Sequence, residues 1–244
     1  MIHHDGSSIA ARAYLHIRRR VLSGEYPAGQ RLVTRQLASE VGASLNPVRE
    51  ALGRLAAEGI VDHLPGAGSF VRQPELNEIL ELYEFRQALE PFAARKAAQS
   101  ISQPELAILS EVCDHQYQVA QSLRPRRLPP TNLVAGSTEP HLQGDELLAW
   151  FEQEERFHST LIGAARNSHF DRTIRNSRVL TQLFHCHRTL GLHVTHSVAA
   201  RTWGVHLRIV RALEKRDGEA AAQLMHSALK AGANQSVQSA ARRL

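Results

Sequence analysis

One short segment, residues 44 to 55, limits the fold of this chain more than any other. Ser44 is placed to cap a helix, and Pro47 fits the first turn because a first-turn residue needs no intrahelical N–H partner. An apolar stripe follows at helical spacing, made of Val48, Leu52 and Leu55. The helix should therefore pack by this stripe and present Asn46 and Arg49 on its other face.

The flanking residues extend this helix into a larger pattern. A glycine ends it, and residues 60 to 71 predict two short strands around a glycine turn, the arrangement of a wing. Upstream, residues 10 to 23 have a helical pattern, residues 27 to 32 indicate a turn, and a short helix follows a candidate cap at Thr34 and closes at Gly42. Two helices across a tight glycine turn form a helix-turn-helix.

An ordered set of short motifs runs through this part of the chain: Leu22-x-Gly24, Pro27-x-Gly29-x-x-Leu32, Leu37-Ala38, Gly42, Ser44, Pro47 to Leu52, Glu58-Gly59 and Gly68-x-x-Val71. Together they resemble the winged-helix domain of the GntR family of bacterial transcription regulators. The resemblance implies binding to double-stranded operator DNA with a pseudo-palindromic sequence. The DNA-binding residues that it implies are Arg35, Ser44, Asn46, Arg49, Gly66 and Gly68.

The chain departs from the family at two positions of the reading helix. The family usually has arginine and then threonine directly after the capping serine, whereas this chain has Leu45 and Asn46. Arg49 is the candidate for a bidentate contact with a guanine edge. Taken alone, Arg35 or Arg49 reads as a solvated surface arginine, and the surrounding motifs favour a DNA contact instead.

Composition agrees with a polyanion as partner without establishing one. The formal net charge is +5 and the sequence pI about 9.7, but the charge is not concentrated in one run. No stretch approaches the roughly 18 apolar residues of a membrane span, and the first residues do not resemble a secretory signal, so we expect a cytoplasmic protein. Cys113 and Cys186 lack metal-type spacing and are expected to be reduced, packed thiols.

The pattern of the chain changes after residue 74, where strand signals give way to alanine-rich and leucine-rich helical periods. We therefore predict a mainly α protein, with a winged helix-turn-helix domain at residues 1–73, a linker at 74–77 and an all-α antiparallel bundle at 78–244. The bundle should contain about six helices, at residues 76–99, 102–123, 145–166, 169–190, 197–216 and 218–242. The proline-rich residues 124 to 144 predict a mobile loop.

A second set of motifs spans residues 76 to 230: Arg86-x-x-Leu89-Glu90, Phe157-His158 with Asn167 nine residues on, and His206-x-x-Ile209-Val210-x-Ala212-Leu213. This set resembles the FCD effector-binding domain of the FadR subfamily, although the proline-rich loop is longer than the family pattern. The resemblance implies a homodimer and a small carboxylate effector, such as a hydroxy acid, a sugar acid or a fatty-acid derivative. Arg86 and Asn167 are the implied effector-binding residues.

Three polar residues on apolar helix faces indicate a candidate metal site. Glu154 and His158 are one turn apart on one face, and His206 lies on an apolar stripe that should point inward. A carboxylate and two imidazoles inside a bundle suit zinc, nickel or manganese. The alternative is a metal-free pocket in which His158 bonds to Glu154.

The metal-binding members of the resembled family use one acid and three histidines. In this chain Glu154 replaces the usual aspartate, and Ala228 occupies the fourth ligand position. His226 is two residues early, which is about 200° around a helix, so we expect it to face solvent. Water or effector oxygens can fill such an open position.

Arg86 lies on a helix that is apolar almost all round, so we expect its guanidinium to be buried. A buried guanidinium needs an anionic partner, which is either Glu90 in a structural pair or a ligand carboxylate. The favoured function is a DNA-binding regulator, and specifically a repressor released by a small organic acid. No base or nucleophile motif accompanies the histidines, so a metal-dependent enzyme with a DNA-binding appendage is the weaker alternative. A constitutive DNA-binding protein with a helical dimerisation domain is another.

Overall fold

The computed structural model describes residues 8–73, 75–124, 140–186 and 194–241. The chain divides into two compact units, residues 1–75 with 179–189 and residues 76–178 with 190–244. The first division, after residue 75, falls inside the segment proposed as a linker. Each unit is described by itself below.

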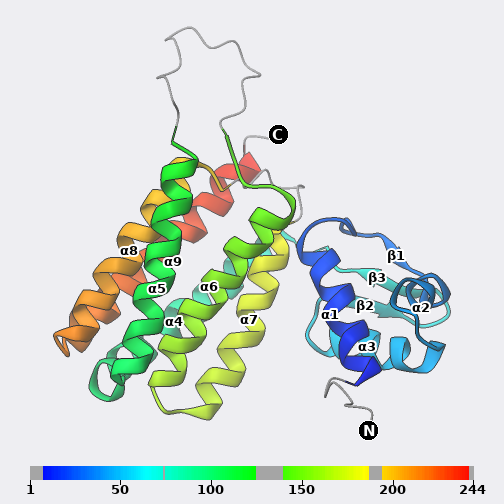
Figure 1. Cartoon of the computed structure of the whole chain (residues 1–244), viewed down its shortest axis with the longest axis horizontal. Helices are drawn as coiled ribbons and strands as arrows, with labels where there is room; N and C mark the ends of the chain where they lie inside the picture. The colour runs from blue at the N-terminus through cyan, green and yellow to red at the C-terminus, as the bar shows by residue number, and fades with distance from the viewer. Residues whose placement is uncertain (1–7, 74, 125–139, 187–193, 242–244) are drawn as a thin grey trace, which may run out of the picture. The chain divides into compact units, whose positions relative to one another are not determined.

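The first unit combines helices with a small antiparallel sheet (Figure 1). Its elements are α1 (Ile9–Leu22), β1 (Arg31–Leu32), α2 (Thr34–Val41), α3 (Leu45–Ala57), β2 (Val61–Leu64) and β3 (Gly68–Val71). The strand β3 lies between β1 and β2, and Ser69 pairs with Leu32 on one side and His63 on the other. The apolar stripe predicted for α3 is buried. This packing holds α3 by one face and leaves the other exposed, as a reading helix requires.

The sequence of residues 27 to 32 predicts a turn, whereas the structure has the strand β1 at Arg31–Leu32. The extended backbone pairs with β3, and the Val71 N–H donates to the Gln30 carbonyl at 2.9 Å. A strand of two residues is too short to leave an alternating pattern in the sequence.

The structure corrects one predicted helix cap, at Thr34, and confirms the position of the other, at Ser44. Thr34 is the first residue of α2, and Val33 takes the cap position because its carbonyl accepts from the Leu37 N–H at 3.0 Å. Ser44 does take the cap position of α3, but its side chain makes no capping hydrogen bond. A capping serine bonds to the second or third N–H of the helix, and the third residue here is Pro47, which has none.

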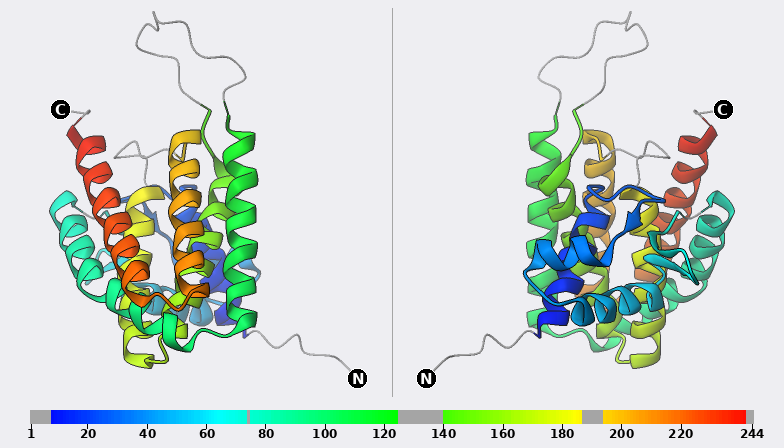
Figure 2. Two further views of the ribbon diagram at one scale, coloured as in Figure 1. Left: turned by 90° about the vertical axis from the view of Figure 1, so that its left-hand side faces the viewer. Right: turned by 90° about the vertical axis from the view of Figure 1, so that its right-hand side faces the viewer.

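The second unit is a bundle of long helices (Figures 1 and 2). They are α4 (Leu76–Ser100), α5 (Gln103–Ser122), α6 (Gly144–Ala164), α7 (Ser168–Cys186), α8 (His196–Glu214) and α9 (Gly218–Ala241). Of α7, only the part up to residue 178 belongs to this unit. Helix α4 packs against α9, and α5 packs against α6 and α8. The predicted mainly α fold is confirmed. Most of the proline-rich segment lies outside the described residues, as does the predicted end of the fourth bundle helix.

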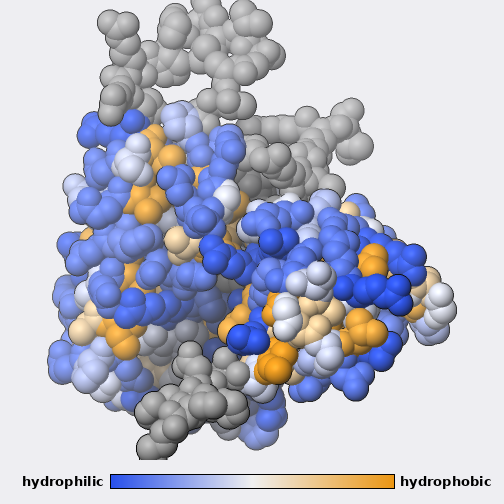
Figure 3. All heavy atoms as spheres, turned by 45° about the vertical axis from the view of Figure 1, so that its right-hand side comes forward, coloured by the Kyte–Doolittle hydropathy of each residue, from blue (hydrophilic) through white to orange (hydrophobic). Residues whose placement is uncertain are grey.

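None of the helices in the described part of the chain is long and apolar enough to cross a membrane. The face drawn in Figure 3 is mainly hydrophilic and carries only small hydrophobic areas.

Candidate functional sites

The outer face of α3 carries the polar residues predicted to read DNA. Asn46 and Arg49 are both exposed, and Arg49 Nη1 donates to Asn46 Oδ1 at 3.4 Å. Leu45, at the start of the helix, is 37 % exposed. Arg35 is exposed in the first turn of α2. All four side chains are exposed, so a ligand can reach them.

The turn of the wing depends on two glycines. Gly66 has φ of 75° and Gly68 has φ of 111°, backbone conformations that strain other residues. Gly66 has open space around it, whereas Gly68 lies close to the side chain of Arg31. The two positions predicted from sequence are therefore the ones that shape the wing tip.

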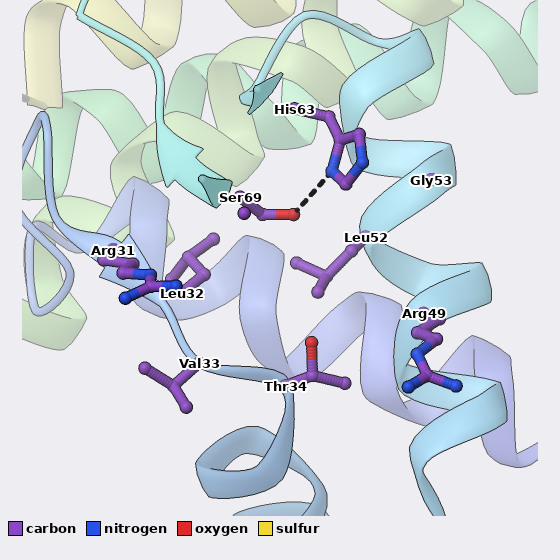
Figure 4. A pocket seen from close by; sticks show the side chains of 10 residues that line it. Arg31, Leu32, Val33, Thr34, Arg49, Leu52, Gly53, His63 and Ser69 are labelled. Carbon is purple, nitrogen blue, oxygen red and sulfur yellow. Dashed lines mark hydrogen bonds between the residues drawn. The ribbon is translucent and has the colours of Figure 1, made fainter. Parts of the chain in front are cut away.

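A hollow of about 550 Å³ lies in the first unit between α3 and the wing (Figure 4). Its walls come from β1, α2, α3 and the hairpin. In Figure 4, Arg31 and Arg49 stand on opposite sides of it, with Thr34 between them. The lining residues are Arg31, Leu32, Val33, Thr34, Arg49, Leu52, Gly53, His63, Gly68 and Ser69. The sequence does not identify Arg31 as a lining residue, because its segment has the pattern of a turn.

The second unit brings together the three residues predicted to bind metal. One possible ligand atom from each of Glu154, His158 and His206 lies within 4.8 Å of the others. Helix α5 adds Gln116, which is fully buried and whose Nε2 donates to Glu154 Oε1 at 2.5 Å. Its Oε1 lies 3.0 Å from His206 Nδ1. We call these four residues the metal cluster.

An ionic network adjoins the metal cluster and is centred on Glu90 of α4. Arg86 Nε donates to Glu90 Oε1 at 2.6 Å. The other oxygen, Oε2, lies 3.2 Å from His158 Nδ1 and 3.7 Å from Arg178 Nη1. Glu90 is 0 % exposed, and both arginines are buried. Arg86 is thus buried as predicted, with Glu90 as its partner in the structure.

The surroundings set the protonation of these groups. Burial by itself raises the pKa of the Glu90 carboxyl, but Arg86, His158 and Arg178 together outweigh this and hold the pKa well below its usual range. Burial lowers the pKa of His158 to about 4, with help from Arg178, and lowers that of His206 well below its usual value. Burial raises the pKa of Glu154 to about 7. Both imidazoles are therefore neutral near pH 7.

The donor set fits a divalent metal. A neutral imidazole is the form that binds metal, and ligating histidines usually donate their other ring N–H to a carboxylate or carbonyl oxygen. Here His158 Nδ1 faces the Glu90 carboxylate, and His206 Nδ1 faces the amide oxygen of Gln116. With the proton on Nδ1, Nε2 of each ring carries the lone pair. The metal-free alternative predicted a pair between His158 and Glu154. In the structure His158 Nδ1 instead lies next to Glu90 Oε2, at 3.2 Å.

Other predicted residues lie outside this cluster. Asn167 Oδ1 accepts from the N–H groups of His169 and Phe170 at 3.1 and 3.3 Å, which is the geometry of a cap on α7. No described contact joins it to the metal cluster. On α9, His226 is exposed and Ala228 is partly buried. Cys113 is a buried free thiol, and the side chain of Cys186 lies outside what the structure describes.

Two residues of the cluster and network were missed from sequence. Gln116 and Arg178 both lie on buried helix faces, and Arg178 is one turn from the buried Ile174. The signal available in the sequence was the place of each polar residue within an apolar stripe of its helix, which indicates a buried polar side chain. Their partners come from other helices, which the stripe alone does not identify.

Comparison with known proteins agrees with this division of the chain. Residues 9–71 match the family model described as bacterial regulatory proteins, gntR family. Residues 81–231, more than half of the chain, match the FCD domain. The helix-turn-helix and the helical bundle thus correspond to two recognised domains.

Curated relatives and solved structures are also similar. The Nta operon transcriptional regulator of Aminobacter aminovorans is 28% identical over 155 residues, which cover 64% of this chain but only 63% of that protein. The transcriptional repressor RspR of Escherichia coli is 26% identical over 213 residues, covering 87% of this chain and 82% of that protein. The structure of E. coli McbR/YncC has a TM-score of 0.75 at 17% identity, with 95% of this chain and 98% of that chain covered, a likeness of fold alone. The chain belongs to the GntR family of DNA-binding transcription regulators, in the group that carries an FCD domain.

Proposed function

We propose that the protein is a homodimeric repressor, which binds a pseudo-palindromic operator and is released by a small organic acid bound in the helical unit. The observation that carries the ligand-binding part is a buried guanidinium nitrogen near three converging ligand atoms. Arg178 Nη1 has no hydrogen-bond partner among the described residues, and one ligand atom from each of Glu154, His158 and His206 lies within 4.8 Å of the others. Buried polar atoms are normally partnered, so a water, an ion or a ligand is expected at Arg178 Nη1.

A divalent metal is the first part of the proposed ligand. Glu154, His158 and His206 would hold zinc, nickel or manganese, and the partly buried Ala228 leaves the family's fourth protein position open. The bound metal would supply a positive centre able to attract carboxylate oxygens. Because an open position accepts water or a ligand oxygen, the effector is proposed to occupy it.

Arg178 is the second part of the proposed effector site. The sequence favoured Arg86 for this role, but the Arg86 guanidinium is already engaged by Glu90 at 2.6 Å. Arg178 Nε donates to Glu155 Oε2 and Nη2 to the Glu154 carbonyl, both at 3.3 Å. Its buried Nη1 has no hydrogen-bond partner among the described residues and lies 3.7 Å from Glu90 Oε2. A carboxylate that reached this guanidinium would gain a charge-assisted hydrogen bond. We therefore assign the effector carboxylate to Arg178, with Arg86 positioning Glu90.

Repression and release need a difference between two states of the protein. An effector shifts DNA binding only if it binds one state more tightly than the other. The relative RspR is named a transcriptional repressor, which supports the sign of regulation proposed here.

A thermal-shift screen tests this function. The full chain, purified without a histidine tag and stripped with chelator, is melted with zinc, nickel or manganese alone and then with hydroxy acids and sugar acids. We expect one metal to raise the melting temperature and one acid to raise it further only when the metal is present, because a ligand of the folded state stabilises it. The same acid should weaken binding to a selected DNA duplex. If neither metals nor acids change melting while the duplex is still bound, the protein is a constitutive DNA-binding protein.

Arg49→Ala is expected to reduce affinity for the selected duplex by about 1–3 kcal/mol for each half-site and to abolish discrimination at one base pair of each half-site, because a bidentate contact is lost there. Fluorescence anisotropy at fixed salt measures this loss. Arg54→Ala is the control, since Arg54 lies on the same helix, is exposed, and stacks over the Tyr14 ring at 4.4 Å. Unchanged affinity and base discrimination in Arg49→Ala would remove Arg49 from the reading face.

A further inference from the structure

The hollow between α3 and the wing is lined by groups suited to an anion. Arg31 and Arg49 line it, together with the hydroxyl-bearing Thr34 and Ser69, and none of its described lining residues is acidic. The Ser69 hydroxyl is held by His63, whose Nδ1 lies 3.1 Å from Oγ (Figure 4). The hollow thus has apolar walls that also carry hydroxyl groups and an excess of positive charge.

The guanidinium of Arg31 has no acidic or hydrogen-bonding partner among the described residues. The side chain is exposed. The pairing of β1 with β3 places the guanidinium beside the wing, where Nε is 3.4 Å from the position that a Cβ on Gly68 would take. The glycine therefore gives the guanidinium room against the wing backbone. Arg31 is a positioned donor on the opposite side of the hollow from Arg49.

The shape of duplex DNA indicates what occupies this hollow. A reading helix lies in the major groove, and a wing beside it reaches the adjacent groove. Neighbouring grooves of a duplex are separated by a sugar–phosphate backbone. The strand that separates them must therefore pass between α3 and the wing, across the hollow.

We propose that the hollow receives this strand and that Arg31 binds one of its phosphates. The inference rests on the proposed binding of DNA through α3 and the wing, and adds a contact that positions both. A guanidinium matches the geometry of phosphate oxygens, and the hydroxyl of Thr34 offers a further donor. Because a phosphate contact carries no sequence information, Arg31 fixes the register of the protein on DNA and does not select bases.

Salt dependence separates a phosphate contact from a base contact. The full chain and Arg31→Ala are titrated with a random-sequence duplex and with a duplex selected by binding to the full chain, over a series of salt concentrations. We expect Arg31→Ala to weaken binding to both duplexes by a similar factor. The slope of log K against log salt should fall in magnitude by about 1.8, because the proposed dimer loses two phosphate contacts, one from each protomer, each worth about 0.9.

Two further variants make the test specific. Arg31→Lys keeps the charge and should retain the wild-type slope. Arg208→Ala removes the same charge from an exposed site on α8 of the helical unit, where Nε donates to the Gly204 carbonyl of its own helix at 3.2 Å, and should leave the slope unchanged. Thermal melting shows whether each variant is folded.

The possible outcomes distinguish failure of the phosphate contact from failure of DNA binding itself. If wild-type protein binds both duplexes and Arg31→Ala keeps the same slope, the phosphate contact is wrong while DNA binding stands. A loss confined to the selected duplex makes Arg31 a base contact and also overturns the proposal. If wild-type protein binds neither duplex, the proposed function itself fails.

Discussion

Replacing Arg86 by alanine is expected to lower the free energy of unfolding by about 3–5 kcal/mol, because removal of one partner leaves a buried charge uncompensated. The remaining charge is Glu90, which is 0 % exposed and lies 2.6 Å from Arg86 Nε in the wild-type protein. Arg178, at 3.7 Å, and the neutral His158 compensate this carboxylate only in part. Urea denaturation followed by circular dichroism measures the change.

Arg95→Ala is the matched control for this prediction. Arg95 lies on the same helix and also pairs with a glutamate, since Arg95 Nη2 is 2.8 Å from Glu219 Oε2. The two side chains of this pair are 45% and 61% exposed, so its loss should cost about 0–1 kcal/mol. If Arg86→Ala is as mild as Arg95→Ala but abolishes the response to an organic acid, Arg86 binds the effector and is not a structural partner of Glu90.

Replacing His206 by alanine is expected to weaken divalent-metal binding by more than about 100-fold, because loss of a second-shell partner alone costs about 10–100-fold. Calorimetric titration of chelator-stripped protein with zinc measures the affinity. His226→Ala is the control, since His226 is exposed on α9 and should have no effect.

The fold of the His206 variant needs its own check. The imidazole stacks on the Phe157 ring, with centroids 3.7 Å apart and planes 4° apart, so alanine leaves a cavity. His206→Gln fills more of that space and keeps a polar side chain without the imidazole. If wild-type protein binds none of the three metals, or if both folded His206 variants bind as tightly as wild type, these residues do not form a metal site.

Local patterns in the sequence predicted the elements that depend on local chemistry. The buried stripe of α3 followed from helical spacing, and the start of α5 followed from a capping box in which Glu105 accepts from the Ser102 N–H at 2.9 Å. The side-chain hydrogen bond expected from the capping Ser44 is absent from α3, because Pro47, the third residue of the helix, has no N–H to donate. The strand β1 was missed because its extended backbone is held by pairing with β3.

The candidate metal site was also predictable in part from local helical spacing. Helical spacing placed His158 and His206 on inward faces, and both are buried. The spacing gives no information on which residues of other helices meet them. Gln116 comes from α5 and Glu90 from α4, so the partners of the two imidazoles depend on how the helices pack against one another. Arg86 had two possible partners in the sequence, and it meets Glu90, which lies one turn along the same helix.

The affinity of the full chain for two duplexes of equal length tests the central claim most directly. One duplex is selected from a random pool by binding to the protein, the other is a scrambled version of it, and both are titrated at one salt concentration. We predict that the selected duplex binds at least about 10³-fold more tightly, as expected for a sequence-specific regulator. Equal affinity for the two duplexes would contradict the claim that this protein reads an operator.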